Sequence, residues 1–400
     1  MTVARPEEVA GILRRAAPHA LVAEVRDLLA RDYRAAGAEL LMADYALARL
    51  RPVTDGPEGA GSVSVRTSAP GRAFGSQEAH VVSRGSEVTV HLPVSVRGDR
   101  LAVLSVDFPA DAYAPGLLGG LRDVADALGH EILVADRDTD LFLRARRATR
   151  LTLAAEMQWE LLPGRSASRP EYALGGQLEP AYAIFGDCFD WSASAEHLTL
   201  TVNNGMGDGI DAALLTSLAV SALRNARRSG LDLVDQASLA DQAVHGQYQG
   251  RLHLAMLLLR FELDTGEVEV IDAGSPRIWR LRQGTVERIE LEAQLPLGMF
   301  EDTVYTCQRL RVLPGDRLFL LSDGVYDVAS PSGEAYGVRA LGRAVMNTRL
   351  LPPSQVPQAI LDELTRHRGE VQASDDAMVV CLDWHGRPGA QTRGSSAQGN

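Results

Sequence analysis

The sequence has few cysteines and no long apolar run. Its three cysteines, Cys188, Cys307 and Cys381, lie far apart among 400 residues, so they form neither a disulfide framework nor a zinc-binding spacing. No apolar stretch approaches the roughly 20 residues that cross a bilayer, and the first residues lack a secretory apolar segment. We therefore expect a protein of the reducing cytoplasm that has no membrane partner.

The sequence also lacks an excess of basic residues. Its formal net charge is −12, whereas nucleic acids and anionic membranes are bound by basic surfaces, so neither is expected as a partner. A hydrophobic share of 46% is normal for a globular protein. A length of 400 residues suits two domains and a connector. The small and polar residues 386–400 predict a disordered tail.

The first half of the sequence predicts helices followed by a hairpin. Helical spacing of apolar residues extends from about residue 7 to 50. Two alternating apolar runs, 88–94 and 101–106, flank a Gly-Asp turn and predict an antiparallel hairpin, and a helix is expected from about residue 116 to 134. This order resembles the second half of a GAF domain. The resemblance implies a GAF-like sensory domain at residues 15–137, with a small molecule as its ligand; an unrelated small α+β domain is the alternative.

Residues 138–163 predict a connector helix that ends at a Pro-Gly pair. Four apolar residues recur there every seven positions: Leu141, Ala148, Ala155 and Leu162. Such a seam is typical of a dimeric coiled coil, and a helix that packs on its own domain is the alternative. We expect a signalling connector and a homodimer contact.

Three aspartates in the second half lie at the ends or starts of predicted strands. Asp187, Asp323 and Asp375 each adjoin a run of apolar or alternating residues. Carboxylates gathered at sheet edges are the ligands that Mg²⁺ or Mn²⁺ prefers, and a pair of such ions can activate a water for attack on a phosphoryl group. Taken singly, an Asp-Gly pair also serves as an ordinary turn.

The order of the motifs in this half resembles the PPM-type (protein phosphatase 2C-like) serine/threonine phosphatases of the SpoIIE/RsbU type. The resemblance covers roughly residues 150–384. The matching segments are Phe185–Trp191, Asn203–Gly209, Asp272–Pro276, Leu295–Gly298, Leu321–Val325 and Asp375–Asp376.

This resemblance implies an α/β/β/α sandwich of antiparallel sheets at residues 164–385, and hence an α+β protein overall. It implies hydrolysis of phosphoserine or phosphothreonine by water bound to Mn²⁺ or Mg²⁺, two ions in the family. Asp187, Asp323 and Asp375 would be the catalytic metal ligands, with the carbonyl of Gly205 as a further ligand. The substrate would be a phosphorylated regulatory protein in bacterial signalling, such as an anti-sigma antagonist in sigma factor regulation during a stress response.

Asn204 departs from the family pattern, which places a bridging aspartate at this metal-ligand position. A neutral amide offers one oxygen and no charge to offset the repulsion between two dications, so we expect weaker metal binding. Asp208, further along the loop, could restore part of the charge. The alternatives are a pseudophosphatase that binds a phosphoprotein without turnover, and a protein whose main role is sensing by the N-terminal domain.

Four further residues carry milder interpretations. We expect His253 to be a satisfied structural histidine within a strand and Trp191 to be a packing residue. Asp190 is either a partner of a metal ligand or a turn carboxylate. Asp376 is expected to form local hydrogen bonds while Asp375 faces the metal, or the reverse.

Overall fold

The computed structural model describes residues 5–54, 61–179, 186–337, 339–369 and 375–387. The chain folds into two compact units, Met1–Arg150 and Leu151–Asn400. Within the described residues, none of the helices is both long and apolar enough to span a membrane.

The N-terminal unit contains one antiparallel sheet whose strand order is β3-β2-β1-β6-β5-β4. The predicted hairpin is confirmed as its longest pair, with Val90 opposite Val106. The strands are β1 (Gly37–Ala43), β2 (Arg49–Pro52), β3 (Val63–Ser64), β4 (His80–Arg84), β5 (Glu87–Val96) and β6 (Asp99–Pro109).

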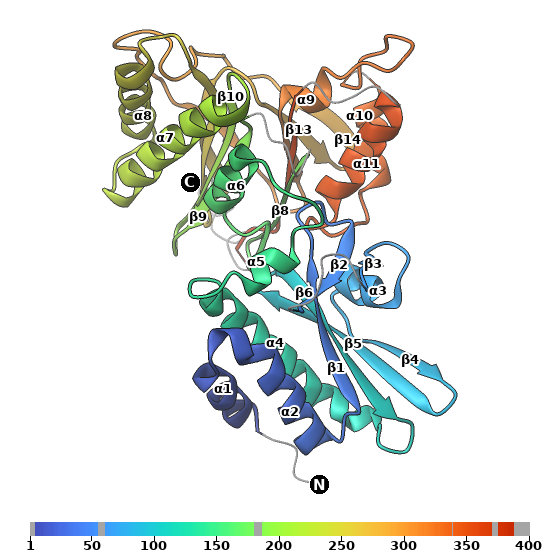
Figure 1. Cartoon of the computed structure of the whole chain (residues 1–400). Coiled ribbons are helices and arrows are strands. Elements are labelled where there is room, and N and C mark those ends of the chain that lie inside the picture. The colour runs from blue at the N-terminus through green and yellow to red at the C-terminus, as the bar shows by residue number, and fades with distance from the viewer. Residues whose placement is uncertain (1–4, 55–60, 180–185, 338, 370–374, 388–400) are drawn as a thin grey trace, which may run out of the picture. The chain divides into compact units, whose positions relative to one another are not determined.

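Helices cover both faces of this sheet (Figure 1). Because successive strand residues point to opposite faces, Leu40 and Met42 pack with α1 (Pro6–Arg15), α2 (Leu21–Tyr33) and α4 (Leu118–Ala135). Leu41 and Ala43 pack on the other face with α3 (Ala69–Ser76). The helix expected at residues 116–134 is therefore confirmed as α4.

The helical spacing expected up to residue 50 was wrong beyond Tyr33. The helix α2 ends there because Arg34 adopts a left-handed conformation with φ of 61°, and β1 starts at Gly37. A short apolar run such as residues 40–43 is compatible with either a helix or a strand by its periodicity alone. Pairing with β6 decided the outcome.

The connector was expected to be one helix, and this was also wrong. The structure has two short helices, α5 (Leu141–Ala145) and α6 (Leu153–Leu161), with non-helical residues between them. Phe142 packs in the core of the N-terminal unit, whereas Thr152 caps α6 by accepting a hydrogen bond from the amide of Ala155. The seven-residue seam therefore does not lie on one continuous helix, because Ala148 is outside both.

The C-terminal unit contains two antiparallel sheets. The five-stranded sheet has the order β15-β12-β11-β10-β9, and the six-stranded sheet has the order β14-β13-β16-β17-β8-β7. The first contains β9 (Cys188–Ala193), β10 (His197–Gly205), β11 (Leu254–Glu262), β12 (Glu267–Ala273) and β15 (Gln308–Arg311). The second contains β7 (Ser166–Ser168), β8 (Tyr172–Glu179), β13 (Arg277–Arg282), β14 (Thr285–Ile289), β16 (Arg317–Leu321) and β17 (Ala377–Trp384).

The two sheets pack face to face, and helices cover their outer faces. Phe261 of one sheet stacks on Trp384 of the other, with ring centroids 5.9 Å apart. The helices α7 (Gly209–Arg228) and α8 (Leu233–Tyr248) cover the five-stranded sheet. The helices α9 (Asp323–Tyr326), α10 (Ala340–Asn347) and α11 (Val356–Arg368) cover the six-stranded sheet. The expected α/β/β/α sandwich is therefore confirmed in the described residues.

Candidate metal site and adjoining pocket

The structure brings the predicted acidic residues to neighbouring strand ends of the sandwich. Asp187 precedes β9, Asn204 and Gly205 end β10, Asp323 follows β16 as the first residue of α9, and Asp375 precedes β17. Phe185, the first residue of the Gly-Asp motif, lies outside the described residues. The strand ends therefore place these side chains as the sequence predicts.

Glycines allow these strand ends to approach closely. A Cβ atom on Gly186, whose φ is 133°, would lie 2.9 Å from the carbonyl oxygen of Gly205. A Cβ atom on Gly205 would lie 2.6 Å from Oγ1 of Thr216, and one on Gly324 would overlap the carbonyl of Asp376. Only glycine fits these positions without moving the backbone.

Asp187 is the most deeply buried of the three predicted aspartates, with 2% of its surface exposed. Burial raises its pKa well above the usual value, and the nearby charges of Asp376, Asp375 and Asp323 raise it further, against a hydrogen bond with Ser322 that lowers it. Its Oδ2 atom is buried and makes no hydrogen bond within the described part of the chain. A buried carboxylate oxygen without a partner is costly, so a cation at this atom would be stabilising.

Asp376, and not Asp375, makes the structural hydrogen bonds. Its fully buried Oδ2 accepts from the amides of Gly186 and Asp187 at 2.9 and 3.1 Å. Asp375 is exposed, and its Oδ1 accepts from the amide of Asp376 at 2.8 Å. Of the two arrangements left open by the sequence, the structure thus favours Asp376 as the residue that holds the β9 end in place and Asp375 as the one available to a ligand.

The donor chemistry fits a hard divalent cation, but the coordination shell is not complete. All candidate donors are oxygens, as Mg²⁺ and Mn²⁺ prefer. Burial raises the pKa of Asp375, and repulsion from Asp323 raises it further, against a hydrogen bond from the amide of Asp376 that lowers it. Among the described residues, however, no three His, Cys, Asp or Glu side chains are grouped closely enough to hold an ion. The carboxylates are therefore near one another without forming a finished site.

Asn204 bonds directly to one of the predicted ligands. Its Nδ2 donates a hydrogen bond of 2.5 Å to Oδ1 of Asp323, and this same oxygen also accepts from the amide of Gly324 at 3.0 Å. One oxygen of Asp323 is thus occupied by two N–H donors. A carboxylate at position 204 could not make this contact, because it would repel Asp323.

The other candidate residues differ from their predicted roles. Asp190 is not a turn carboxylate, and within the described residues no hydrogen bond joins its side chain to a proposed metal ligand. It is buried in β9 and pairs with Arg224 at 2.7 Å and Arg227 at 3.2 Å. His253 precedes β11, and its buried Nδ1 has no hydrogen-bond partner in the described regions, so the expectation of a satisfied histidine was wrong. Asp208 is exposed just before α7.

The helix α6 contacts the candidate site through residues that the sequence did not single out. The fully buried Gln158 donates from Nε2 to the carbonyl oxygen of Asp187 at 2.9 Å. Arg224 of α7 donates to the carbonyl of Leu161 at 2.6 Å and also holds Asp190. A polar residue on the apolar face of a predicted helix was the only sequence signal for Gln158.

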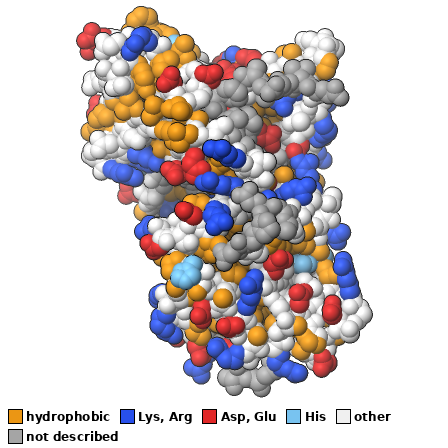
Figure 2. Space-filling model, viewed as in Figure 1, with side chains coloured by type: hydrophobic (Ala, Val, Ile, Leu, Met, Phe, Trp, Pro, Cys, Tyr) orange, Lys and Arg blue, Asp and Glu red, His pale blue; other side chains and the backbone are white. Residues whose placement is uncertain are grey.

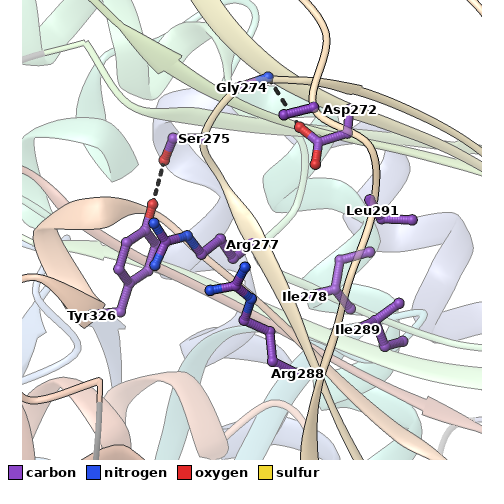
Figure 3. Close-up of a pocket in the computed structure, with 10 residues that line it drawn as sticks. Asp272, Gly274, Ser275, Arg277, Ile278, Arg288, Ile289, Leu291 and Tyr326 are labelled. Atoms are coloured by element: carbon purple, nitrogen blue, oxygen red, sulfur yellow. Dashed lines mark hydrogen bonds between the residues drawn. The ribbon is translucent and has the colours of Figure 1, made fainter.

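A pocket of about 260 Å³ opens beside Asp272 and the turn that follows it (Figure 3). Ser275 Oγ and Tyr326 Oη lie 2.8 Å apart, and the guanidinium of Arg277 lies 4.1 Å from the centre of the Tyr326 ring. Burial raises the pKa of Asp272 to about 6, against a hydrogen bond from the amide of Gly274 that lowers it. The remaining walls are formed by Ile278, Arg288, Ile289, Leu291 and Ala293.

Apolar side chains are also exposed at the start of α7, next to the Asn204 loop. Met206, Ile210 and Leu214 are 45, 49 and 46% exposed and follow one another at helical spacing. Figure 2 shows hydrophobic side chains gathered over α7 and α8 in this unit.

The C-terminal half of the chain is similar in sequence to known proteins. Residues 194–385 match the sequence model of the family described as Stage II sporulation protein E (SpoIIE). Phosphoserine phosphatase RsbP of Bacillus subtilis (strain 168) is 24% identical over 206 residues, which cover 50% of this chain and 49% of RsbP. Phosphoserine phosphatase RsbU of the same organism is 21% identical over 207 residues, which cover 52% of this chain and 62% of RsbU. The matches thus span less than two thirds of either relative.

A solved structure of the PP2C phosphatase domain of SpoIIE from Bacillus subtilis, with a fragment of its regulatory domain, is also similar. The superposed region covers 78% of this chain and 83% of the chain in that structure, with a TM-score of 0.49 and 12% sequence identity. The C-terminal unit is thus similar in sequence to the SpoIIE family. The matched segment, residues 194–385, includes Asn204, Asp323 and Asp375 but starts after Asp187.

Proposed function

We propose that the C-terminal unit hydrolyses phosphoserine or phosphothreonine on a regulatory protein in bacterial signalling. The observation that carries this proposal is the buried Oδ2 of Asp187, which has no hydrogen-bond partner within the described residues and lies among other carboxylates. The family match supports it, because the relatives RsbP and RsbU are named phosphoserine phosphatases. As the substrate we propose a phosphorylated anti-sigma antagonist or a similar regulatory protein in the cytoplasm.

The proposed metal ligands are Asp187, Asp323 and Asp375, the carbonyl of Gly205, and Asn204. Bound Mn²⁺ or Mg²⁺ would supply an activated water and offset the negative charge of the phosphoryl group. The protein side chains have separate tasks. Asp187 would hold the cation from β9, and Asp376 fixes the backbone of Gly186 and Asp187 so that the Asp187 carboxylate keeps its position.

A second function is favoured by one contact. Because the Asn204 amide already donates to Asp323, that carboxylate has a partner without any metal. A domain of this kind could bind a phosphoprotein without hydrolysing it, as a pseudophosphatase. The exposed residues Met206, Ile210 and Leu214 beside the site offer an apolar surface for such a protein partner.

For the N-terminal unit we propose a GAF-like sensory domain that binds a small molecule. Its single antiparallel sheet, covered by helices on both faces, agrees with the resemblance noted in the sequence. Its signal would reach the phosphatase domain through α6, whose Gln158 touches the carbonyl of Asp187.

The test is Mn²⁺-dependent hydrolysis of a phosphoserine peptide by the full chain, compared with Asp323→Ala. We expect release of phosphate by the natural protein and its loss in the variant. Absence of hydrolysis, together with Mn²⁺-independent binding of the peptide, would exclude the enzyme and support the pseudophosphatase. Absence of both hydrolysis and binding would contradict both functions.

A further inference from the structure

The pocket beside Asp272 is connected to the candidate metal site along two routes. Tyr326 in its wall is on the same short helix as Asp323; burial raises the pKa of the Tyr326 hydroxyl, and the charge of Asp323 adds to this effect. On the other side, a Cβ atom on Gly274 would touch Cβ of Ala255 at 3.2 Å, and Ala255 is the register partner of Asn204. A ligand in this pocket would therefore lie next to the phosphoryl group that the metal site is proposed to hold.

Arg277 provides a positive charge in this pocket, and this charge acts on the Asp272 carboxylate there by lowering its pKa against the effect of burial. Within the described residues it forms no ion pair, and its guanidinium lies over the Tyr326 ring. The other arginines of this region are already engaged: Arg288 pairs with Glu290 at 2.6 Å, and Arg280 pairs with Glu287. Because Arg277 is exposed at the start of β13, its N–H groups are accessible to an anion.

The groups around Arg277 suit a side chain that is acidic at its tip and apolar along its length. The hydroxyls of Ser275 and Tyr326 are hydrogen-bonded to each other, so the hydroxyl that accepts this bond still has its own proton to donate. Figure 3 shows Arg277 and Arg288 extending toward the Tyr326 side, with Ile278, Ile289 and Leu291 along the other wall. Oδ1 of Asp272, in the wall of the same pocket, accepts a hydrogen bond from the amide of Gly274 at 3.0 Å.

We propose that this pocket is a second anion subsite, in which Arg277 and the Ser275–Tyr326 hydroxyl pair bind an acidic side chain of the phosphoprotein substrate close to its phosphoserine. This inference rests on the proposed phosphatase function for the identity of the substrate. Charge-assisted hydrogen bonds from arginine to a carboxylate are strong and directional. The subsite would therefore select phosphorylation sites that have a glutamate or aspartate nearby.

The experiment compares two phosphoserine peptides, one with glutamates beside the phosphoserine and one with glutamines at the same positions. Full-length natural protein, Arg277→Gln and Arg280→Gln are assayed with Mn²⁺ on both peptides and on p-nitrophenyl phosphate. Arg280 is the matched control, because it is on the same strand, pairs with Glu287 and does not line the pocket. Thermal unfolding of each variant verifies that folding is unchanged.

We expect Arg277→Gln to lower kcat/KM about tenfold on the glutamate peptide, mainly through KM, because one charge-assisted contact is lost. Its activity on p-nitrophenyl phosphate and on the glutamine peptide should stay at that of Arg280→Gln. Equal preference for the two peptides in the natural protein would overturn the proposal. An equal loss on p-nitrophenyl phosphate would also overturn it, since Arg277 would then contact the reacting phosphoryl group.

If the natural protein hydrolyses none of these substrates, the phosphatase function fails and the pocket is tested by binding. Fluorescence anisotropy of the two labelled peptides then gives the affinities. Weaker binding of the glutamate peptide alone by Arg277→Gln supports the subsite. Equal affinities of Arg277→Gln and the natural protein for that peptide contradict it, and so does binding of inorganic phosphate without binding of the peptide.

Discussion

The amide of Asn204 donates a 2.5 Å hydrogen bond to the carboxylate of Asp323, across the ends of two strands that belong to different sheets. In the family that the sequence resembles, an aspartate is expected at position 204. The contact shows how the chain accommodates the amide: it supplies a second neutral donor, beside the amide of Gly324, to a carboxylate that lies near other negative charges. The same contact reduces the negative charge available to a metal.

Asn204→Asp should strengthen metal binding and lower the stability of the metal-free fold. The new carboxylate repels Asp323 and loses the hydrogen bond, which we expect to destabilise the metal-free fold by about 1–3 kcal/mol. Added Mn²⁺ should reverse this loss, because a ligand that binds only the folded state stabilises it. Thermal unfolding with and without Mn²⁺ measures both effects.

Asp208→Asn serves as the control for that variant, since Asp208 is exposed and lies in the same loop. It should change neither stability nor the response to Mn²⁺. A similar response of both variants to Mn²⁺ would show that loop charge in general, and not the position facing Asp323, governs metal binding.

Gln158→Met should disturb the candidate site from a distance. The substitution removes the buried donor to the carbonyl of Asp187, and a buried carbonyl without a donor costs about 1–3 kcal/mol. We expect a lower midpoint of urea unfolding and weaker Mn²⁺ binding by calorimetry. Glu160→Gln, an exposed change on the same helix, should leave both values unchanged; a silent Gln158→Met would mean that α6 does not support the site.

Asp190→Asn should be among the most destabilising single changes in the C-terminal unit. Asp190 is 3% exposed and pairs with both Arg224 and Arg227. Its replacement leaves two guanidinium groups without their carboxylate, which we expect to lower the free energy of unfolding by about 3–5 kcal/mol. Urea denaturation checks this value. Glu287→Gln breaks the exposed pair with Arg280 and should cost only about 0–1 kcal/mol. Comparable losses in the two variants would argue against a special role for the Asp190 pair.

The stability of the protein should depend on the protonation of Asp272. Burial raises the pKa of this carboxyl to about 6, above its value in the unfolded chain, so the folded state binds the proton more tightly. The contribution of Asp272 is therefore fully present below about pH 4 and is lost as the pH rises through about 6. Unfolding of the natural protein and of Asp272→Asn, measured from pH 4 to 8, should show a difference that changes sharply in this interval. A pH-independent difference would refute the assignment.

Part of the fold could be predicted from the periodic spacing of apolar residues in the sequence. The hairpin of β5 and β6 and the helix α4 were both predicted, because their apolar residues repeat at the spacing of the final structure. Errors occurred where periodicity is ambiguous. Residues 40–43 form a short apolar run that became part of a strand because it pairs with β6. Residues 146–152 contain no Pro or Gly that would mark the break between α5 and α6.

The candidate site was predictable in its acidic residues but not in their contacts. Asp187, Asp323 and Asp375 were found because each adjoins a strand, and Asn204 because it departs from the family pattern. The buried role of Asp376, the pairing of Asp190 with two arginines and the pocket near Arg277 were not predictable. Each depends on contacts between residues that are far apart in the chain, and the spacing of neighbouring residues in the sequence does not predict such contacts.

The sequence by itself determined the resemblance of the C-terminal half to a known family, the strands and turns that carry its acidic residues, and the presence of an amide where that family has an aspartate. Only the tertiary structure decided which side chains touch: that Asn204 donates to Asp323, that Gln158 donates to the carbonyl of Asp187, and that Arg277 lies over the Tyr326 ring. The physical reason is that a strand or helix arises from local backbone preference and periodic burial. A hydrogen bond between strand ends, in contrast, exists only after two sheets have packed face to face.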